Sequence, residues 1–260
     1  MTTTSGLLHS LLLAAAALIA AAAAPDSAFL IACAQGLPAC AHVWREPVPS
    51  FFNATVRTPH GPFTILVNTS AAPAMARRFF VLHALGYARG GPFYRVLAAP
   101  GRAPFVAQWG YRGDPAVDAA WVALRTSNAT APALLSNTRG TVAFGTSEVA
   151  NSGAQPGCTA PLCSQGFSVE LFVNLADNSP RLDAMGFSPF GVVTSGMGAV
   201  DALFAGYGEC ADLCAGEVPP SPFCVPKKAG GYAGVNFTRM LAEGSATYLR
   251  PTFPLLDYVG

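Results

Sequence analysis

The feature that most constrains the fold of this chain is a series of short β-branched and aromatic runs, each bounded by glycine or proline. The clearest are residues 63–67 (FTILV) and 169–175 (VELFVNL), which have the length and composition of buried strands. The 26 glycines and 22 prolines among 260 residues favour many turns and argue against a helical bundle. The sequence therefore predicts a mainly β domain.

Further short strands are predicted at residues 93–98, 105–109, 141–144 and 190–194, with a closing strand at 235–240. Only two helices are expected. One follows Ser70, has Pro73 in its first turn and stops at Gly86, and a shorter one covers residues 197–205. Residues 111–137 are interpreted as a loop. Many strands with two helices predict a closed or nearly closed antiparallel barrel in a single domain.

The N-terminal residues 1–34 differ in composition from the remainder. Residues 7–24 are apolar apart from His9 and Ser10, and no Asp, Glu, Lys or Arg precedes Asp26. An apolar stretch followed by small residues is typical of a secretory signal peptide, with cleavage between residues 24 and 34. The alternative is an uncleaved membrane anchor, because this apolar stretch approaches the spanning length.

Two further features agree with the secretory route. Four Asn-X-Ser/Thr sequons are candidate glycosylation sites: Asn53, Asn68, Asn128 and Asn236. The chain has seven cysteines, and removal of Cys33 with the leader would leave six, an even number suited to disulfides in an oxidising compartment. The sequence therefore predicts a secreted or lumenal protein.

The cysteines that would remain are the disulfide candidates: Cys40, Cys158, Cys163, Cys210, Cys214 and Cys224. Six cysteines allow about fifteen connectivities, so the pairing stays open. The arrangement we favour closes a loop between Cys158 and Cys163 and forms two more bridges among the other four. Neither short spacing is Cys-X-X-Cys and no pair of histidines lies nearby, so no metal site is predicted.

Charge and motifs exclude several classes of protein. Fifteen Lys and Arg residues balance fourteen Asp and Glu residues, so no basic stripe is available for nucleic acid. No Gly-X-Ser-X-Gly nucleophile motif and no phosphate-binding loop occurs. The four histidines are scattered and no carboxylate pair stands out, which leaves no evident acid–base constellation.

One arginine stands among aromatic and apolar residues, in the run Phe93-Tyr94-Arg95-Val96. A charged side chain that points inward from such a strand must meet a carboxylate or face a pocket. Alternation along a strand also permits the opposite reading, in which Arg95 points to solvent. Periodicity alone leaves both readings open.

Seven segments occur in a recognisable order: FYRV (93–96), PG (100–101), FVAQWG (105–110), RGTVAFGT (139–146), VELFVNLADNSPRLD (169–183), FSPFGVV (187–193) and GMGAVDALFAGYGE (196–209). This order resembles the cyclophilin family of peptidyl-prolyl cis-trans isomerases. The resemblance covers roughly residues 55–242, with residues 35–54 as a lead-in, a Cys-rich insertion at 208–231 and a tail at 243–260. It implies a closed eight-stranded antiparallel β-barrel capped by two α-helices, and a reaction that needs no cofactor.

The resemblance also assigns roles by position. The family's catalytic arginine is matched by Arg95, its pocket phenylalanines by Phe105 and Phe172, and its groove glutamine by Gln108. Substrate-binding positions are matched by Val106, Gly145, Thr146, Glu170, Leu182 and Phe187. The pocket would hold a proline ring while Arg95 donates to the twisting amide, whose rotation barrier is ~18–20 kcal/mol.

The chain departs from the family pattern near this groove. Glu170 places a carboxylate where an amide is usual, and it is expected either to pair with Arg95 or to compete with substrate for that arginine. Arg181 replaces the tryptophan linked to cyclosporin binding. Phe187 stands where His or Tyr is frequent, and Trp109 where a glycine is usual. The loop before Phe105 is about three residues longer.

Three functions are therefore considered. The first is a prolyl isomerase of the secretory pathway that assists the folding of other chains. The second is a cyclophilin-like module that binds Pro-containing peptides with weak turnover. The third is a disulfide-stapled domain without a peptide groove. The expected partners are Pro-containing peptides or unfolded protein clients of a monomeric chain, with membrane contact only through an uncleaved leader.

Overall fold

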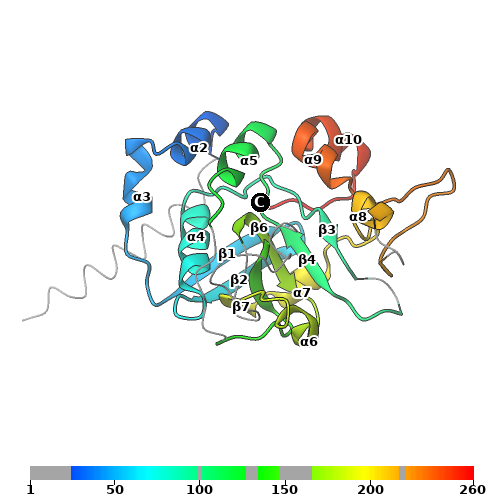
Figure 1. Ribbon diagram of the computed structural model, residues 1–260, viewed down its shortest axis with the longest axis horizontal. Coiled ribbons are helices and arrows are strands. Elements are labelled where there is room, and N and C mark those ends of the chain that lie inside the picture. Colours follow the sequence, from blue (N-terminus) through cyan, green and yellow to red (C-terminus); the bar gives the residue numbers. More distant parts are fainter. Residues whose placement is uncertain (1–24, 99–100, 127–133, 147–165, 217–220) are drawn as a thin grey trace, which may run out of the picture.

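A computed structural model describes residues 25–98, 101–126, 134–146, 166–216 and 221–260. Within these ranges, seven strands form one antiparallel sheet in the order β1-β2-β7-β5-β6-β4-β3 (Figure 1). The strands are β1 (Phe51–Thr58), β2 (Gly61–Asn68), β3 (Arg95–Val96), β4 (Val106–Trp109), β5 (Thr141–Thr146), β6 (Phe167–Asn174) and β7 (Gly191–Ser195). The mainly β antiparallel architecture expected from the sequence is confirmed.

Helices surround the sheet: α2 (Ser27–Ala34), η2 (Pro38–Cys40), α3 (Ala41–Arg45), α4 (Pro73–Ala84), α5 (Pro115–Val122), α6 (Ser179–Leu182), α7 (Met197–Asp201), α8 (Ala211–Gly216), α9 (Phe237–Gly244), η4 (Ser245–Leu249) and α10 (Arg250–Thr252). In Figure 1, α2, α5 and the α9–α10 pair form a row beyond one end of the sheet, and α4 runs along its side. This is more helix than the two caps that were expected.

The core follows directly from strand alternation. In β2, Phe63, Ile65 and Val67 are fully buried while the residues between them are partly exposed. Phe63 packs edge-on against Trp109, with ring centroids 6.0 Å apart. In β6, which lies between β5 and β4, nearly every residue is buried, including the polar residues Ser168 and Asn174.

The expected closed barrel of eight strands is wrong for the described residues. They contain seven strands, and no ladder joins the edge strands β1 and β3. The C-terminal residues lie between these edges instead, since Phe93 N donates to Asp257 O (2.9 Å) and Gly260 N donates to Arg57 O (3.0 Å). One isolated bridge, between Pro92 and Tyr258, forms there. Proline has no N–H, so Pro92 donates no ladder hydrogen bond at this bridge.

The helix predicted after Ser70 is confirmed as α4, with Pro73 at its first position, although its N-cap is Ala72 rather than Ser70. The second predicted helix is confirmed in part, because α7 ends at Asp201 rather than at residue 205. The loop predicted at 111–137 contains α5, whose N-cap Asp114 accepts hydrogen bonds from the backbone N–H groups of Ala116 and Val117.

The closing strand predicted at 235–240 is wrong, because these residues begin α9. The side chain of Asn236 caps this helix by accepting from Arg239 N at 2.8 Å. The predicted lead-in at 35–54 holds η2 and α3, and β1 begins within it at Phe51.

Two disulfides lie within the described residues. They join Cys33 to Cys40 (Cα–Cα 5.4 Å) and Cys214 to Cys224 (Cα–Cα 5.8 Å). Cys33, which was left out of the disulfide candidates, is buried in α2 and bonded to Cys40. The expectation of a disulfide at Cys210 is wrong, because its buried thiol is free. The predicted bridge between positions 158 and 163 and the sequon at position 128 lie outside the described residues.

No single helix in the described ranges is long and apolar enough to cross a membrane. The segments Ser27–Ala34 and Pro38–Arg45 meet that criterion only when taken together, and they are bent by 84° relative to each other. The predicted leader before residue 25 lies outside the described residues.

Two titratable groups are expected to give stability opposite dependences on pH. Burial, together with the charge of Arg89, lowers the pKa of His83 to about 4, so this group costs stability as the pH falls below about 6.5. Burial raises the pKa of Asp118 to about 6, against hydrogen bonds from Tyr87 and the backbone. The native state then holds the Asp118 proton more tightly than the unfolded chain, so its contribution is lost as the pH rises from about 4 to 6.

Urea unfolding of two neutral variants tests this assignment. The free energy of unfolding of His83→Gln is compared with that of the unmodified protein at each pH. This difference is expected to favour the variant by up to about 3 kcal/mol more at pH 4 than at pH 7. For Asp118→Asn the same difference is expected to change in the opposite direction, so that it favours the variant more at pH 7 than at pH 4. Parallel stability curves for the three proteins would contradict the two pKa assignments.

Candidate active site

A pocket of about 560 Å³ opens on one side of the sheet, over β3, β4 and β6. Apart from Thr146, whose side chain the structure does not describe, it is lined by all the predicted catalytic and substrate-binding residues: Arg95, Phe105, Val106, Gln108, Gly145, Glu170, Phe172, Leu182 and Phe187. One end is apolar, because Val106, Phe172 and Leu182 belong to a buried cluster against which Phe105 and Phe187 pack. The other end is polar.

Strand register explains why these residues meet. Arg95 lies opposite Gln108 in the β3–β4 pair, and Gln108 lies opposite Phe172 in the β4–β6 pair. Residues directly opposite each other in antiparallel strands project from the same face of a sheet. Glu170 precedes Phe172 by two positions in β6 and therefore shares this face. The register thus gathers Arg95, Gln108 and Glu170 on one face of the sheet.

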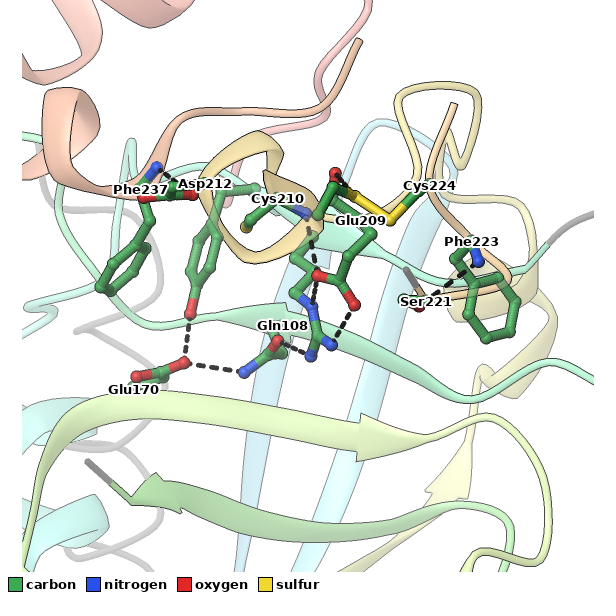
Figure 2. Close-up of polar contacts among 12 residues, drawn as sticks. Gln108, Glu170, Glu209, Cys210, Asp212, Ser221, Phe223, Cys224 and Phe237 are labelled. Carbon is green, nitrogen blue, oxygen red and sulfur yellow. Dashed lines mark hydrogen bonds and ion pairs between the residues drawn. A yellow bond between two sulfur atoms is a disulfide. The ribbon is translucent and has the colours of Figure 1, made fainter. Parts of the chain in front are cut away.

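Arg95 forms a two-pronged ion pair with Glu209 (Figure 2). Its Nε and Nη2 donate to the two carboxylate oxygens, with 2.5 Å between Nη2 and Oε2, and its Nη1 donates to Gln108 Oε1. The side chains of Arg95 and Glu209 are only 16% and 2% exposed. Burial acts to lower the pKa of Arg95, but the hydrogen bonds and charge of Glu209 outweigh it and raise the pKa. The guanidinium therefore stays charged.

Glu170 does not pair directly with Arg95, which was one of the two roles expected for it. Its Oε1 accepts from Tyr94 OH (2.8 Å) and from Gln108 Nε2 (2.7 Å), so Gln108 lies between the two charged groups (Figure 2). Burial raises the pKa of the Glu170 carboxyl, although the hydrogen bond from Tyr94 and the charge of Arg95 act the other way. The result is a chain of polar contacts from Tyr94 to Glu209.

Sequence reasoning missed Glu209. An inward-facing arginine requires a carboxylate or a pocket, and here Arg95 has both. Glu209 lies 114 residues away in the chain, at the start of the Cys-rich insertion, and nothing in its local pattern distinguishes it. The sequence signal for such a partner was a charged arginine within an apolar strand. No spacing rule could say which carboxylate neutralises it.

Two of the departures from the family pattern, Trp109 and Glu170, do not block the pocket. Trp109 points away from Gln108 into the core and is only 1% exposed, so it does not crowd the groove. Gly145 leaves room for the Glu170 side chain, because an added Cβ would lie 2.8 Å from Glu170 Cγ. A carboxylate at 170 and a glycine at 145 are thus sterically matched.

Two other departures reshape the apolar end. Arg181 lies over the ring of Phe105, with 5.3 Å from its guanidinium carbon to the ring centroid. Phe187 packs edge-on against Phe172, with centroids 5.6 Å apart. Both place aromatic or cationic surface around the apolar end of the pocket.

The remaining chemistry of the pocket is limited. Among the described residues, no group of three His, Cys, Asp or Glu side chains is arranged to hold a metal ion. Cys210 lines the pocket, but burial raises the pKa of its thiol, which disfavours the reactive thiolate. The arrangement offers an apolar cup beside a fixed cationic donor, which suits recognition of an apolar ring next to an amide.

The family profile of cyclophilin-type peptidyl-prolyl cis-trans isomerases matches residues 52–212. The chain therefore belongs to the cyclophilin-type peptidyl-prolyl cis-trans isomerase family, a family of enzymes. No curated protein matches the chain.

Similar solved structures share little sequence with this chain. A cyclophilin-type peptidyl-prolyl cis-trans isomerase from Cryptosporidium parvum is 16% identical, with a TM-score of 0.41 over 58% of this chain and 82% of that one. The same protein in the presence of the dipeptide Ala-Pro is 14% identical, with a TM-score of 0.42 over 70% and 91%. Cyclophilin AquaCyp293 from Hirschia baltica is 13% identical, with a TM-score of 0.39 over 61% and 70%.

Replacing Glu170 with glutamine is expected to preserve the pocket and to raise stability at pH 7 by about 1 kcal/mol. Both hydrogen bonds end on Oε1, so an amide oxygen in that position accepts them equally well. The substitution also removes a carboxylate that burial disfavours. Urea unfolding at pH 7 measures the change. A loss of stability would show that the negative charge itself is needed. Gly145→Ala is the steric control, because its added Cβ would crowd the Glu170 side chain without changing the charge.

Proposed function

We propose that this protein catalyses cis–trans isomerisation of Xaa-Pro peptide bonds in chains that fold within the secretory pathway. The observation that carries the proposal is the position of Arg95, which is fixed beside an apolar cup formed by Phe105, Val106 and Phe172. The cup would hold the pyrrolidine ring while the carbonyl side of the bond rotates.

The reaction requires a donor that is stronger in the twisted state than in the planar one. Rotation removes amide resonance and leaves a lone pair on the proline nitrogen, and a charged N–H group can stabilise it or the carbonyl oxygen. A guanidinium carries five N–H donors, and the described contacts of Arg95 use three of them. The remaining N–H bonds are available to substrate.

A second candidate function is a binding module with weak turnover. The observation that favours it is the same ion pair, because a carboxylate on Arg95 reduces the positive charge that the arginine presents to a substrate. The two candidates differ in rate and not in binding, so one experiment separates them.

Exchange NMR on an Ala-Pro peptide is that experiment, with the oxidised protein added in catalytic amounts. Accelerated exchange between the cis and trans signals supports the isomerase. Peptide shifts without accelerated exchange support the binding module instead. Absence of both would contradict both candidates.

The secretory location is supported by the disulfides at Cys33–Cys40 and Cys214–Cys224. A cut before Pro25 would retain α2 and the first of these bridges, whereas a cut after Ala34 would break it. Of the sequon residues, Asn53 is exposed on β1, which suits glycosylation. Expression in a secreting eukaryotic cell, with N-terminal sequencing and glycosidase treatment of the product, tests this location. Retention of the apolar leader would contradict cleavage.

A further inference from the structure

Glu209 makes more contacts than an incidental counter-ion would. Its two oxygens accept from Arg95 Nε and Nη2, and Oε1 also accepts from Cys210 N at 2.8 Å. The carboxylate is almost completely buried. Charge-assisted, two-pronged pairs of this kind fix the orientation of a guanidinium as well as its charge. The direction of the Arg95 donors therefore depends on Glu209.

The backbone around Glu209 is held by the returning half of the Cys-rich insertion and by the residues that follow it. Glu209 N donates to Phe223 O at 3.1 Å, and Ala211 N donates to Val235 O at 2.9 Å. The two segments approach so closely that a Cβ on Gly234 would lie 1.7 Å from Glu209 O. Only glycine permits this contact, which leaves Glu209 little freedom to shift.

A disulfide closes this insertion beside the pocket. Cys224 follows Phe223 directly and is bonded to Cys214 in α8 (Figure 2). The ring of Phe223 packs against the apolar cluster that forms the cup. Arg102, in the lengthened loop before Phe105, donates to Pro222 O from the other side. The insertion is therefore anchored at the cup, at the disulfide and at the Arg95 ion pair.

We propose that Glu209 is a positioning residue for the isomerase reaction and that the Cys214–Cys224 disulfide holds it in place. Glu209 occupies one edge of the Arg95 guanidinium, Gln108 receives one Nη1 bond, and the remaining donors are directed at the substrate amide. This inference rests on the proposed function. It adds a residue outside the strands of the groove, carried by the Cys-rich insertion.

Glu209→Gln and Glu209→Ala test the positioning role, with Glu243→Gln as a matched control at a surface ion pair. We expect Glu209→Ala to lower kcat about tenfold or more while KM changes about twofold or less, since the contact acts on the rotating bond more than on the ring. Glu209→Gln keeps one accepting oxygen, so its kcat should lie between that of Glu209→Ala and that of the unmodified protein. Glu243→Gln should behave as the unmodified protein.

The NMR signal of the Arg95 Nε–H group provides a readout that a loss of stability would not move. It should be protected from solvent exchange in the unmodified protein and lose that protection in Glu209→Ala. Unchanged or higher kcat in Glu209→Ala would overturn the proposal, and so would an unchanged Nε–H signal. If the unmodified protein fails to accelerate exchange, the proposed function fails, while the Nε–H signal still decides whether Glu209 fixes Arg95.

Removal of the disulfide tests the second half of the proposal. We expect Cys214→Ser with Cys224→Ser to lower kcat in the same direction as Glu209→Ala, whereas Cys33→Ser with Cys40→Ser should leave it unchanged. In a Glu209→Ala background, loss of the Cys214–Cys224 bridge should lower kcat further by less than about twofold, because both changes act through one contact. Independent, multiplicative losses would overturn the coupling.

Discussion

Arg95→Ala is expected to reduce kcat/KM about 100- to 1,000-fold, the usual effect of removing a donor aimed at the transition state. The same change is expected to lower the free energy of unfolding by about 3–5 kcal/mol, because Glu209 would remain buried without its partner. Exchange NMR of a Pro-containing peptide and urea unfolding measure the two effects separately. The stability loss follows from the 2% exposure of the Glu209 side chain.

A double variant distinguishes the catalytic loss from the stability loss. Arg95→Ala with Glu209→Ala removes both charges, so it should recover much of the stability and none of the activity. If the double variant is no more stable than Arg95→Ala, the uncompensated carboxylate is not the cause of the loss. If Arg95→Ala retains most of its activity, the assigned role of Arg95 is wrong.

Trp121→Ala is expected to destabilise the protein by about 3–5 kcal/mol, the range for removing a large buried aromatic side chain. Trp121 is completely buried in α5 and stacks on Trp44 with ring centroids 5.7 Å apart. Its Nε1 donates to Leu30 O at 3.0 Å, so one side chain joins α2 and α3 to the rest of the molecule. Urea unfolding measures the loss.

The effect should be largest in the N-terminal helices. Hydrogen exchange of α2 amides should accelerate in Trp121→Ala more than exchange of β6 amides does. Trp44→Ala is the matched control. Trp44 is only partly buried, so its substitution should lower the free energy of unfolding less than Trp121→Ala does. A change below about 1 kcal/mol in Trp121→Ala would show that the packing of α2 on α5 contributes little to stability.

Several elements were predictable because their signals are local. Strands 63–67 and 169–175 are rich in β-branched and aromatic residues, and α4 carries a proline at its start and a glycine after its end. The capping residues of α5 and α9, Asp114 and Asn236, were equally local signals, but their segments were assigned to a loop and to a strand. Such errors arise because propensity is a weak guide where tertiary packing decides.

The pairings were not predictable from local pattern. Which cysteines join depends on where the chain returns, and Cys33 meets Cys40 only because α2 and η2 fold against each other. The same holds for the edges of the sheet. The tail reaches the space between β1 and β3 through contacts with Arg57 and Phe93, which no period in the tail sequence encodes.

For this protein, the sequence by itself determined strands β2 to β7 and the order of the groove motifs, whose side chains alternation places on one face of the sheet. Only the tertiary structure decided the partner of Arg95. A buried charge must be neutralised, but the neutralising carboxylate is selected by proximity in space, and Glu209 is brought to Arg95 by the path of a disulfide-closed insertion.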